Sequence, residues 1–359
     1  MQENHFIKSF VRLGREMKNL KNPLLADAMR LARKDNPFFT IEMQRAAIIN
    51  IVDKFLQPRP LEWLLNHAGG DGKISERGEG DLWEKTVGII MAGNLPLVGF
   101  HDFLCTLACG RNAYIKLSSK DSRLLPAVYK MLCNIDSYWS GKVVFCKFAS
   151  NTCAIIASGS DDSMAEIKKE YPGVPKLLRG SRFSFAVVNG KESEEQLCNL
   201  TEDMLLYFGL GCRSVSYLFV PEHYDFKNLI KAAQKMKLNG TRSIKQIMMS
   251  VDAYKNSYLR MRALNIMGGA NICAPDSSCA DENGFIDGGF FILQRGNSVH
   301  PPLAQINFAY YKYKKDVADF EKTNKSKIQK KYTTFGLAQR PEIDDFADRA
   351  DTVRFILKN

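Results

Sequence analysis

Cys212 is the residue of this 359-residue sequence whose type and setting best suit covalent chemistry. It stands in the segment FGLGCRS, where the preceding glycines let the backbone come close to a bound molecule. Arg213 follows directly, and a neighbouring cation favours the thiolate over the thiol. A thiolate can attack a carbonyl or a thioester and form a covalent intermediate. The alternative is that one cysteine of nine simply follows a helix.

A second candidate is Asn94, in the turn AGNLP that follows the strand-like run Val87–Met91. Open α/β sheets bind their ligands at the carboxyl ends of the strands. An amide donor at such a position can stabilise an oxyanion. The alternative is an ordinary turn between a strand and a helix.

His101, Cys105 and Cys109 recur every four residues, so they share one face of a predicted helix. That spacing can suit a soft metal ion. The neighbouring side chains are nearly all apolar, however, and no fourth ligand is evident. We therefore expect these thiols to pack as small hydrophobic groups, with no metal site.

The elements that must position Asn94 follow one another in a regular order. Residues 5–66 show helical spacing, and the Gly-rich, charged segment 69–81 is typical of a linker. After it, strands and helices alternate, at 87–91, 98–109, 113–116, 124–136, 142–147 and 152–158. This alternation predicts βαβ units and hence an α/β fold with a Rossmann-type parallel sheet.

The elements around Cys212 form a second such series. Phe183–Val188 has the composition of a buried strand, and Ser193 to Gln196 form a capping box for a helix. That helix ends at Gly209, and a strand at Val215–Val220 follows Cys212. Further on, we predict a basic helix over 312–332 and an apolar strand over 353–357.

We place a domain boundary near Asn189. The predicted organisation is a helical segment packed on the cofactor domain (1–80), a nucleotide-cofactor domain (81–189), a smaller α/β catalytic domain (190–335) and a C-terminal segment returning to the cofactor domain or to a partner subunit (336–359).

The charge of the chain indicates an anionic partner. Fifty Lys and Arg against thirty-nine Asp and Glu give a formal charge of +11, which fits a nucleic acid, a membrane surface or a phosphate-rich small molecule. The sequence shows no signal peptide, no apolar run of the ~20 residues that span a membrane, and no CxxC pair. We therefore expect a cytoplasmic protein with reduced thiols.

Three sequence motifs, which follow one another along the chain, resemble motifs of a known protein superfamily. The run GIIMAGNLPLVGFHDFLCTLACGRNAYIKLSSKD resembles the aldehyde dehydrogenase superfamily segment with an Asn-x-Pro turn, a helix and a Lys-containing strand. ASGSDDSMAEI is similar to its Gly-Ser turn and cofactor helix, and FGLGCRSVSYLFVP to its nucleophile loop and following strand. With KLSSKD and the ending FGLAQRPEIDDFADRADTVRFIL, the chain resembles more closely the acyl-CoA reductase family related to the fatty-acid reductase of bacterial luminescence.

The resemblance implies roles for individual residues. Cys212 would take the acyl group from coenzyme A as an enzyme thioester, and Asn94 with the backbone N–H of Cys212 would form an oxyanion hole. Lys116 would contact the adenosine half of the cofactor. Gly159 and Ser160 would lie near the pyrophosphate, at a helix N-terminus that favours anions.

One departure from the superfamily concerns water activation. Typical members carry a general-base Glu before a Gly-Gly-Lys segment, and the matching stretch here, LLRGSRF, has Leu178 at or near that place. No acidic residue occurs between Pro172 and Asn189. The loss of this base disfavours an acid-forming dehydrogenase and fits exchange of the acyl group with coenzyme A.

Other departures concern the cofactor. Where NAD-preferring relatives often have a Glu that binds the ribose, this chain has Ser119, with Ser118 before it and Lys120 after it. A cation without a carboxylate suits a 2′-phosphate, so we expect Ser118 and Ser119 to contact NADPH, with NADH the less favoured cofactor. The segment 297–306, the counterpart of a nicotinamide-ribose Glu, contains no acid.

The resemblance thus implies NADPH-dependent reduction of an acyl-CoA or other acyl thioester to an aldehyde. An aldehyde- or acyl-phosphate-utilising dehydrogenase of the same superfamily is an alternative. Another is a non-catalytic basic module for an acyl carrier protein or a nucleic acid, since KTNKSKIQKKY (322–332) combines cations with an aromatic ring. We expect an acyl-transfer or acyl carrier partner and a homodimer, and no nucleic acid, because coenzyme A and NADPH supply the phosphates that the positive charge would attract.

Overall fold

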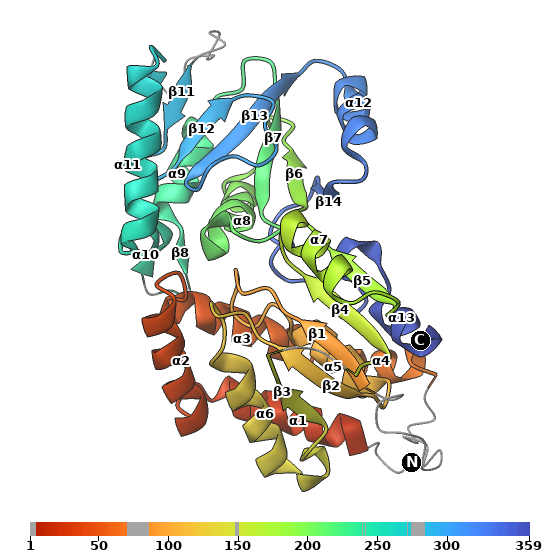
Figure 1. Ribbon diagram of the computed structural model, residues 1–359. Coiled ribbons are helices and arrows are strands. Elements are labelled where there is room, and N and C mark those ends of the chain that lie inside the picture. Colours follow the sequence, from red (N-terminus) through yellow and green to blue (C-terminus); the bar gives the residue numbers. More distant parts are fainter. Residues whose placement is uncertain are drawn as a thin grey trace. The chain divides into compact units, whose positions relative to one another are not determined.

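A computed structural model describes residues 5–69, 86–147, 151–238, 240, 242–270, 272–273 and 284–359 of the chain. The chain forms two compact units, Met1–Ser181 together with Pro341–Asn359, and Arg182–Arg340. Figure 1 shows the helices and strands of both units.

The first unit is built on a parallel sheet. Its described strands are β1 (Thr86–Ile90), β2 (Asn112–Lys116), β3 (Val143–Phe145), β4 (Ala154–Ser158) and β5 (Lys176–Arg179). They lie in the order β3-β2-β1-β4-β5, and every neighbouring pair is parallel. All residues of β1 are buried, as expected for a strand covered on both faces. This order is doubly wound, with its reversal point between β1 and β4, and it confirms the predicted Rossmann-type sheet.

Helices surround this sheet. They are α1 (His5–Lys18), α2 (Pro23–Asp35), α3 (Ile41–Lys54), α4 (Pro58–His67), α5 (Phe100–Ala108), α6 (Leu124–Ile135), α7 (Asp161–Glu170) and α13 (Thr352–Lys358). The four N-terminal helices share one apolar core with β1, β2, α5 and α6. Local chemistry sets their starts: Thr40 accepts a hydrogen bond from the Met43 N–H before α3, and Pro58 opens α4, where its missing N–H costs nothing.

The second unit contains a larger, mostly parallel sheet. Its described strands are β6 (Phe183–Val187), β7 (Val215–Pro221), β10 (Ile272–Cys273), β11 (Phe285–Asp287), β12 (Ile292–Arg295), β13 (Gln305–Tyr311) and β14 (Ile328–Tyr332). Their order is β10-β11-β12-β13-β7-β6-β14, and among the described strands of this sheet only the β11–β12 pair is antiparallel. The division after Ser181 differs from the boundary expected near Asn189, because β6 pairs with β7 and β14 and so belongs to this sheet.

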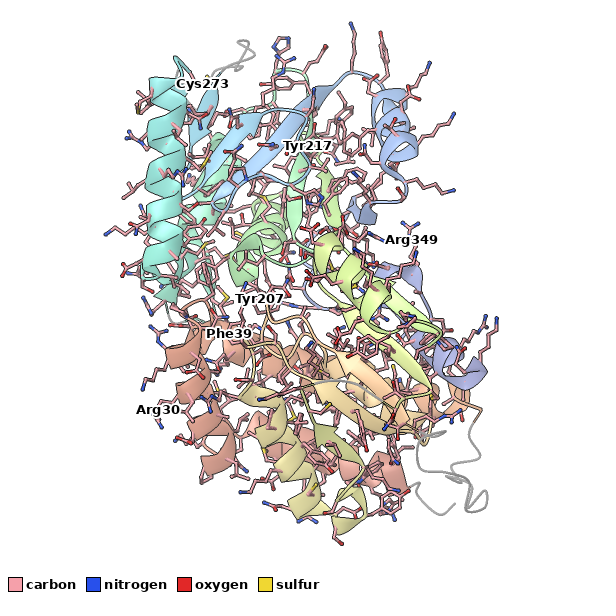
Figure 2. The ribbon with its side chains drawn as sticks, viewed as in Figure 1. Arg30, Phe39, Tyr207, Tyr217, Cys273 and Arg349 are labelled. Atoms are coloured by element: carbon pink, nitrogen blue, oxygen red, sulfur yellow. The ribbon has the colours of Figure 1, made fainter. Side chains whose placement is uncertain are left out.

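Helices and a short hairpin complete the second unit. They are α8 (Glu194–Leu205), α9 (Lys227–Lys235), α10 (Ile244–Met249), α11 (Asp252–Met267), α12 (Lys314–Asn324), and the pair β8 (Lys237–Leu238) and β9 (Arg242–Ser243). The predicted capping box at the start of α8 is present, with Ser193 accepting from the Gln196 N–H. Tyr217 of β7, labelled in Figure 2, stacks on Phe320 of α12 with ring centroids 5.1 Å apart.

Two predicted elements are wrong. The basic run 312–332 is not one helix but α12 followed by strand β14, whose Gln329 and Tyr332 are buried. The apolar run 353–357 is a helix, α13, capped by Asp351, which accepts from the Arg354 N–H. Periodicity cannot separate a short apolar strand from a short buried helix, and pairing with β6 is a long-range contact that local sequence does not encode.

The state of the cysteines agrees only in part with the expectation of reduced thiols. Seven cysteines of the described chain carry no disulfide, Cys212 among them. Cys273 on β10 is disulfide-bonded, so the expectation of uniformly reduced thiols is wrong at this position. Within the described residues, no helix combines the length and the apolar character that a bilayer crossing requires.

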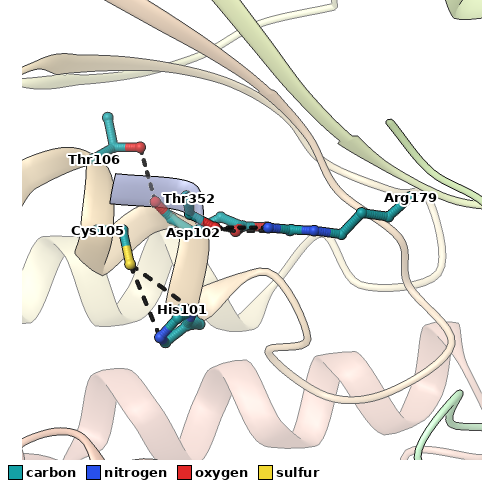
Figure 3. A network of polar contacts seen from close by, with 6 residues as sticks. All are labelled: His101, Asp102, Cys105, Thr106, Arg179 and Thr352. Atoms are coloured by element: carbon teal, nitrogen blue, oxygen red, sulfur yellow. Dashed lines mark hydrogen bonds and ion pairs between the residues drawn. The ribbon is translucent and has the colours of Figure 1, made fainter. Parts of the chain in front are cut away.

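A buried ion pair links three elements of the first unit (Figure 3). Both terminal nitrogens of Arg179, at the end of β5, are engaged: Nη1 donates to the two Asp102 oxygens of α5 at 2.8 and 2.7 Å, and Nη2 donates to Thr352 Oγ1 of α13 at 2.6 Å. The side chains of Arg179 and Asp102 are only 6% and 10% exposed. Burial alone would lower the pKa of Arg179, but the charge of Asp102 outweighs it and raises that pKa above its usual value.

Asp102→Ala should destabilise the first unit by about 3–5 kcal/mol, because it leaves the Arg179 charge buried without its partner. Trp63 and Trp139 lie in this unit, and residues 182–340 of the second unit contain no tryptophan, so fluorescence during urea unfolding reports on the first unit. Asp27→Ala is the matched control, since its ion pair with Arg30 is exposed and should contribute less than about 1 kcal/mol. Equal losses in the two variants would contradict the assigned importance of the buried pair.

Candidate active site

The carboxyl edge of the first sheet gathers the residues expected to bind a cofactor. Ile90, the last residue of β1, lies opposite Lys116 of β2 and Ala157 of β4. The turn with Asn94, Lys116 itself, and Gly159 therefore all emerge from neighbouring strands at the same edge. The fold brings these predicted residues together, while their individual roles stay predictions.

Two loops at this edge pack tightly against each other. A side chain at Gly93 would collide with both side-chain atoms of Ser118, so the position requires glycine. The Met91 N–H donates to Lys116 O at 3.0 Å, and the Lys120 N–H donates to Ser118 Oγ at 3.2 Å. Ser118 thus supports the loop, whereas Ser119 and Lys120 are exposed and accessible to a ligand.

Asp121 stabilises the turn that carries Asn94 by accepting a backbone hydrogen bond. The sequence did not predict this role. The Leu97 N–H donates to Asp121 Oδ2 at 2.7 Å, and Leu97 has the left-handed φ of 57° that a branched side chain rarely adopts. Burial raises the pKa of Asp121 to about 6, although the Leu97 hydrogen bond lowers it. The segment KLSSKD contained the only available signal, an acid placed directly after the loop.

Gly159 and Ser160 connect β4 to α7. The Gly159 N–H donates to Arg179 O at 3.1 Å, and Ser160 caps the helix by accepting from the Ser163 N–H at 3.2 Å. Asp161 and Asp162 occupy the first turn of the helix. The helix N-terminus therefore offers N–H groups to an anion, but with two carboxylates close by.

Lys147 is a cation that the sequence analysis did not single out. Lys147 lies just after the end of β3, and Lys116 is the last residue of β2. Both lysines line an open hollow of about 520 Å³, together with Ile115, Leu117, Phe145 and Cys146. The described residues around this hollow include no carboxylate.

In the second unit, Cys212 lies on a tight turn between a 3₁₀ turn (Leu206–Gly209) and β7. The Ser214 N–H donates to Gly211 O at 3.0 Å, and the Ser184 hydroxyl donates to Cys212 O at 2.9 Å. Cys212 is half-buried. The backbone at the thiol is therefore held from β6 as well as by its own turn.

The backbone just before this turn is strained. Tyr207 (φ 55°, ψ 31°) and Phe208 (φ 61°, ψ 21°) are both left-handed, although both are buried and neither is glycine. Tyr207 is labelled in Figure 2. Such residues cost about 1–3 kcal/mol each and persist only where the surrounding structure imposes them, most often at functional sites.

A segment distant in sequence supports the turn that carries Cys212. Asp203 of α8 is fully buried and accepts from the Gly336 N–H at 2.7 Å and the Ala338 N–H at 2.9 Å. Gln339, the next residue, donates to Ser214 Oγ at 2.9 Å. Burial raises the pKa of Asp203 to about 6, against the effect of those two N–H groups. The motif FGLAQRP thus has a structural role beside Cys212.

Cys212 lines a cavity of about 240 Å³ within the second unit. Apolar and aromatic side chains form much of its wall, including Met204, Phe208 and Phe291. The segment Val299–Ile306 forms another side, so the acid-free stretch 297–306 does reach this site. Leu178 belongs to the first unit, on β5 opposite Ala157, where it packs against an apolar cluster of that unit.

Solved structures with the same fold are aldehyde dehydrogenases. The chain is similar to betaine aldehyde dehydrogenase from Staphylococcus aureus, with 14% identity, a TM-score of 0.59 and coverage of 92% of this chain and 75% of the other. It is similar to the NAD+ complex of an aldehyde dehydrogenase from Bacillus cereus, with 16% identity, a TM-score of 0.58 and coverage of 88% of this chain and 68% of the other. It is also similar to succinic semialdehyde dehydrogenase from Streptococcus pyogenes in complex with NADP+, with 14% identity, a TM-score of 0.56 and coverage of 93% of this chain and 83% of the other. No curated protein matches the sequence.

The fold is therefore that of the aldehyde dehydrogenases. The family model for the acyl-CoA reductases, LuxC, matches residues 85–242, a stretch that includes the carboxyl edge of the first sheet and Cys212. This part of the chain is therefore similar in sequence to acyl-CoA reductases, on a fold that is similar to that of the aldehyde dehydrogenases.

The raised pKa of Asp121 predicts a pH dependence of stability. Its folded-state pKa of about 6 lies above the usual value of 3.8, so between pH 4 and 6 the folded chain holds a proton that the unfolded chain has released. Rising pH should therefore lower the free energy of unfolding, by up to about 3 kcal/mol from this group. Asp121→Asn should remove this contribution to the pH dependence of the free energy of unfolding. The corresponding contribution of Asp203 is the same in the wild type and the variant, so it cancels in their difference.

Urea unfolding at pH 4, 5, 6 and 7 measures this effect as the difference between wild type and variant. The difference should change steadily between pH 4 and 6. Parallel stability curves for the two proteins would show that Asp121 is not desolvated in the folded state.

Proposed function

We propose that the protein reduces an acyl-CoA, or another acyl thioester, to the aldehyde with NADPH, through a thioester on Cys212. The observation that carries the proposal is the position of Cys212, half-buried on a hydrogen-bonded turn at the wall of a cavity that is lined by both apolar and polar side chains. The match of residues 85–242 to acyl-CoA reductases supports the thioester as substrate.

The Cys212 thiolate would attack the acyl carbonyl carbon, forming a new C–S bond as the coenzyme A thiolate leaves. Asn94 and the Cys212 N–H are the groups proposed to stabilise the oxyanion. NADPH, when bound, supplies the hydride that reduces the acyl carbon. Collapse of the resulting hemithioacetal breaks the C–S bond, releases the aldehyde and regenerates the thiolate. The sum is acyl-CoA, NADPH and a proton giving aldehyde, coenzyme A and NADP+.

The residues at the carboxyl edge of the first sheet fit a phosphate-bearing dinucleotide. Two lysines, Lys116 and Lys147, line the open hollow there. Ser119 and Lys120 are exposed on the adjoining loop, and neither carries a carboxylate that would repel a 2′-phosphate. Cations without a competing acid favour NADPH over NADH. The solved relatives with NADP+ and with NAD+ support a nicotinamide cofactor in general.

The packing of Leu178 supports reduction over hydrolysis. Release of a carboxylic acid from the enzyme thioester needs a base that activates water. Leu178, at the position where typical relatives carry that base, is an apolar side chain packed against the core. We therefore propose that the acyl group leaves by hydride transfer or returns to coenzyme A.

Cys212→Ala should abolish acyl transfer. Incubated with an acyl-CoA and no reductant, the wild type should show an acyl adduct by intact-protein mass spectrometry, and the variant should show none. Cofactor oxidation should fall at least about a thousandfold. Cys198→Ala is the matched control, because Cys198 is a free, partly exposed thiol on α8 of the same unit. An adduct that survives in Cys212→Ala and disappears in Cys198→Ala would contradict the assignment.

Ser119→Glu should shift the cofactor preference toward NADH. The new carboxylate would repel a 2′-phosphate and accept a hydrogen bond from a 2′-hydroxyl, so the ratio of kcat/KM for NADPH to that for NADH should fall roughly tenfold or more. Ser140→Glu is the control, since Ser140 is an exposed serine that precedes β3 at the opposite edge of the sheet. Equal rates with both cofactors in the wild type would refute the proposed preference.

A further inference from the structure

Apart from Cys212 itself, His300 is the one residue in the described wall of the Cys212 cavity that gains and loses a proton near neutral pH. Arg182 also lines the cavity, but a guanidinium group keeps its proton in proteins. Tyr254 is completely buried, and this burial raises the pKa of its hydroxyl. The described wall contains no carboxylate. His300 is therefore the residue of this wall that can act as an acid.

The side chain of His300 is available for that role. It is exposed, and neither ring nitrogen has a hydrogen-bond partner among the described residues. The three histidines of the first unit are engaged instead: His5 and His67 each contact a carboxylate, and His101 contacts a backbone oxygen. Because His300 is exposed, the solvent can replace a proton that its ring gives up.

His300 and Cys212 lie at the same edge of the second sheet. Cys212 precedes β7, and His300 precedes β13, the strand that pairs with β7 in parallel. Arg182 comes directly before β6, which pairs with β7 on its other side. Parallel neighbours begin at one edge of a sheet, so these residues gather at the amino ends of three adjacent strands, β13, β7 and β6 (Figure 1).

Hydrogen bonds and ring packing hold both residues at this edge. The Ser216 hydroxyl, on β7, donates at 3.0 Å to the backbone oxygen of the residue before His300. The His300 ring meets the ring of Phe183 edge-on, with centroids 5.8 Å apart. The next residue of β6, Ser184, donates to Cys212 O at 2.9 Å. His300 and Cys212 are thus attached to the first residues of the same two strands.

The cavity that the two residues line is small. A cavity of about 150 Å³ holds one benzene molecule, and this one measures about 240 Å³. A thioester group bound at Cys212 therefore lies close to the rest of the wall, including the part that His300 forms.

The proposed reaction requires a proton at a defined step. When the Cys212 thiolate displaces coenzyme A, the departing sulfur carries a negative charge. Alkyl thiols hold their proton at neutral pH, so an unprotonated alkyl thiolate is a poor leaving group. The overall reaction also consumes one proton for each aldehyde formed. A positioned acid in the cavity meets both requirements.

We propose that His300 is a catalytic acid of the acyl-transfer step. Its imidazolium donates a proton to the coenzyme A sulfur while the new C–S bond to Cys212 forms and the old C–S bond breaks. Coenzyme A leaves as the thiol, and the neutral imidazole takes a proton from the solvent. Arg182 supplies no proton and contributes only its positive charge, which favours a thiolate. The inference rests on the proposed function and adds the proton donor to it.

The test changes the leaving group, which separates proton donation from binding. Butanoyl-CoA needs a proton on its alkyl sulfur, whereas the butanoyl thioester of 4-nitrothiophenol releases a stabilised aryl thiolate that needs none. The rate at which each acylates Cys212 is measured without NADPH, by rapid quenching and intact-protein mass spectrometry. His300→Asn should slow the reaction of butanoyl-CoA about a hundredfold and that of the aryl thioester less than about threefold.

Two controls accompany this comparison. His223→Asn is the matched variant, because His223 is an exposed histidine of the same unit that follows the carboxyl end of β7, whereas the cavity lies at the amino end. Both of its rates should equal those of the wild type. Imidazole in solution should restore part of the rate of His300→Ala with butanoyl-CoA, a response that a purely structural role would not give.

The inference and the proposed function fail in different ways. If His300→Asn slows both thioesters equally, or slows neither, His300 is not the acid and the proposed function stands. Normal reaction of the aryl thioester also shows that the variant is folded. If the wild type forms no adduct on Cys212 with either thioester, the proposed function is wrong and the inference falls with it.

Discussion

The buried pair of Asp102 and Arg179 is the interaction on which the first unit most depends. Asp102 lies in the first turn of α5, the helix that follows the Asn94 turn, and Arg179 ends β5, the last strand before the chain enters the second unit. Thr352 adds the C-terminal helix to the same network. Two charges in a low-dielectric interior are tolerated only when they are paired and hydrogen-bonded, so the three elements must keep their positions together. The Gly159 N–H donates to Arg179 O at 3.1 Å, which connects the carboxyl edge of the first sheet to this network.

The second unit uses a buried carboxylate in a similar way. Asp203 holds residues 336–338 through their N–H groups, and Gln339 reaches from there to the turn of Cys212. Near the same turn lie two left-handed aromatic residues and Tyr254, whose hydroxyl has no hydrogen-bond partner among the described residues. Each is locally unfavourable, and folded proteins concentrate such departures where they bind or react. Their presence around one cavity supports the placement of the reacting group there.

Much of this arrangement could be predicted from the sequence. The alternation of elements predicted the parallel sheet, and the rule that ligands bind at the carboxyl ends of strands brought Asn94, Lys116 and Gly159 to one edge. Lys147 was missed because the predicted strand over 142–147 included it, whereas β3 ends at Phe145 and leaves Lys147 beyond its carboxyl end. Asp121 was missed because its effect is exerted through the backbone of Leu97, a residue 24 positions earlier in the chain.

The amino-acid sequence by itself determined many of the local elements, carried the family resemblance and singled out Cys212 as the candidate nucleophile. Helical periodicity, capping boxes and glycine turns depend on neighbours a few residues apart, so the order of residues is sufficient to reveal them. Only the tertiary structure decided that 328–332 is a strand beside β6, that 353–357 is a helix, and that His300 lines the same cavity as Cys212. Those outcomes depend on burial and on the pairing of segments distant in the chain. An unpaired buried hydroxyl, in particular, exists only once the fold has excluded water from it.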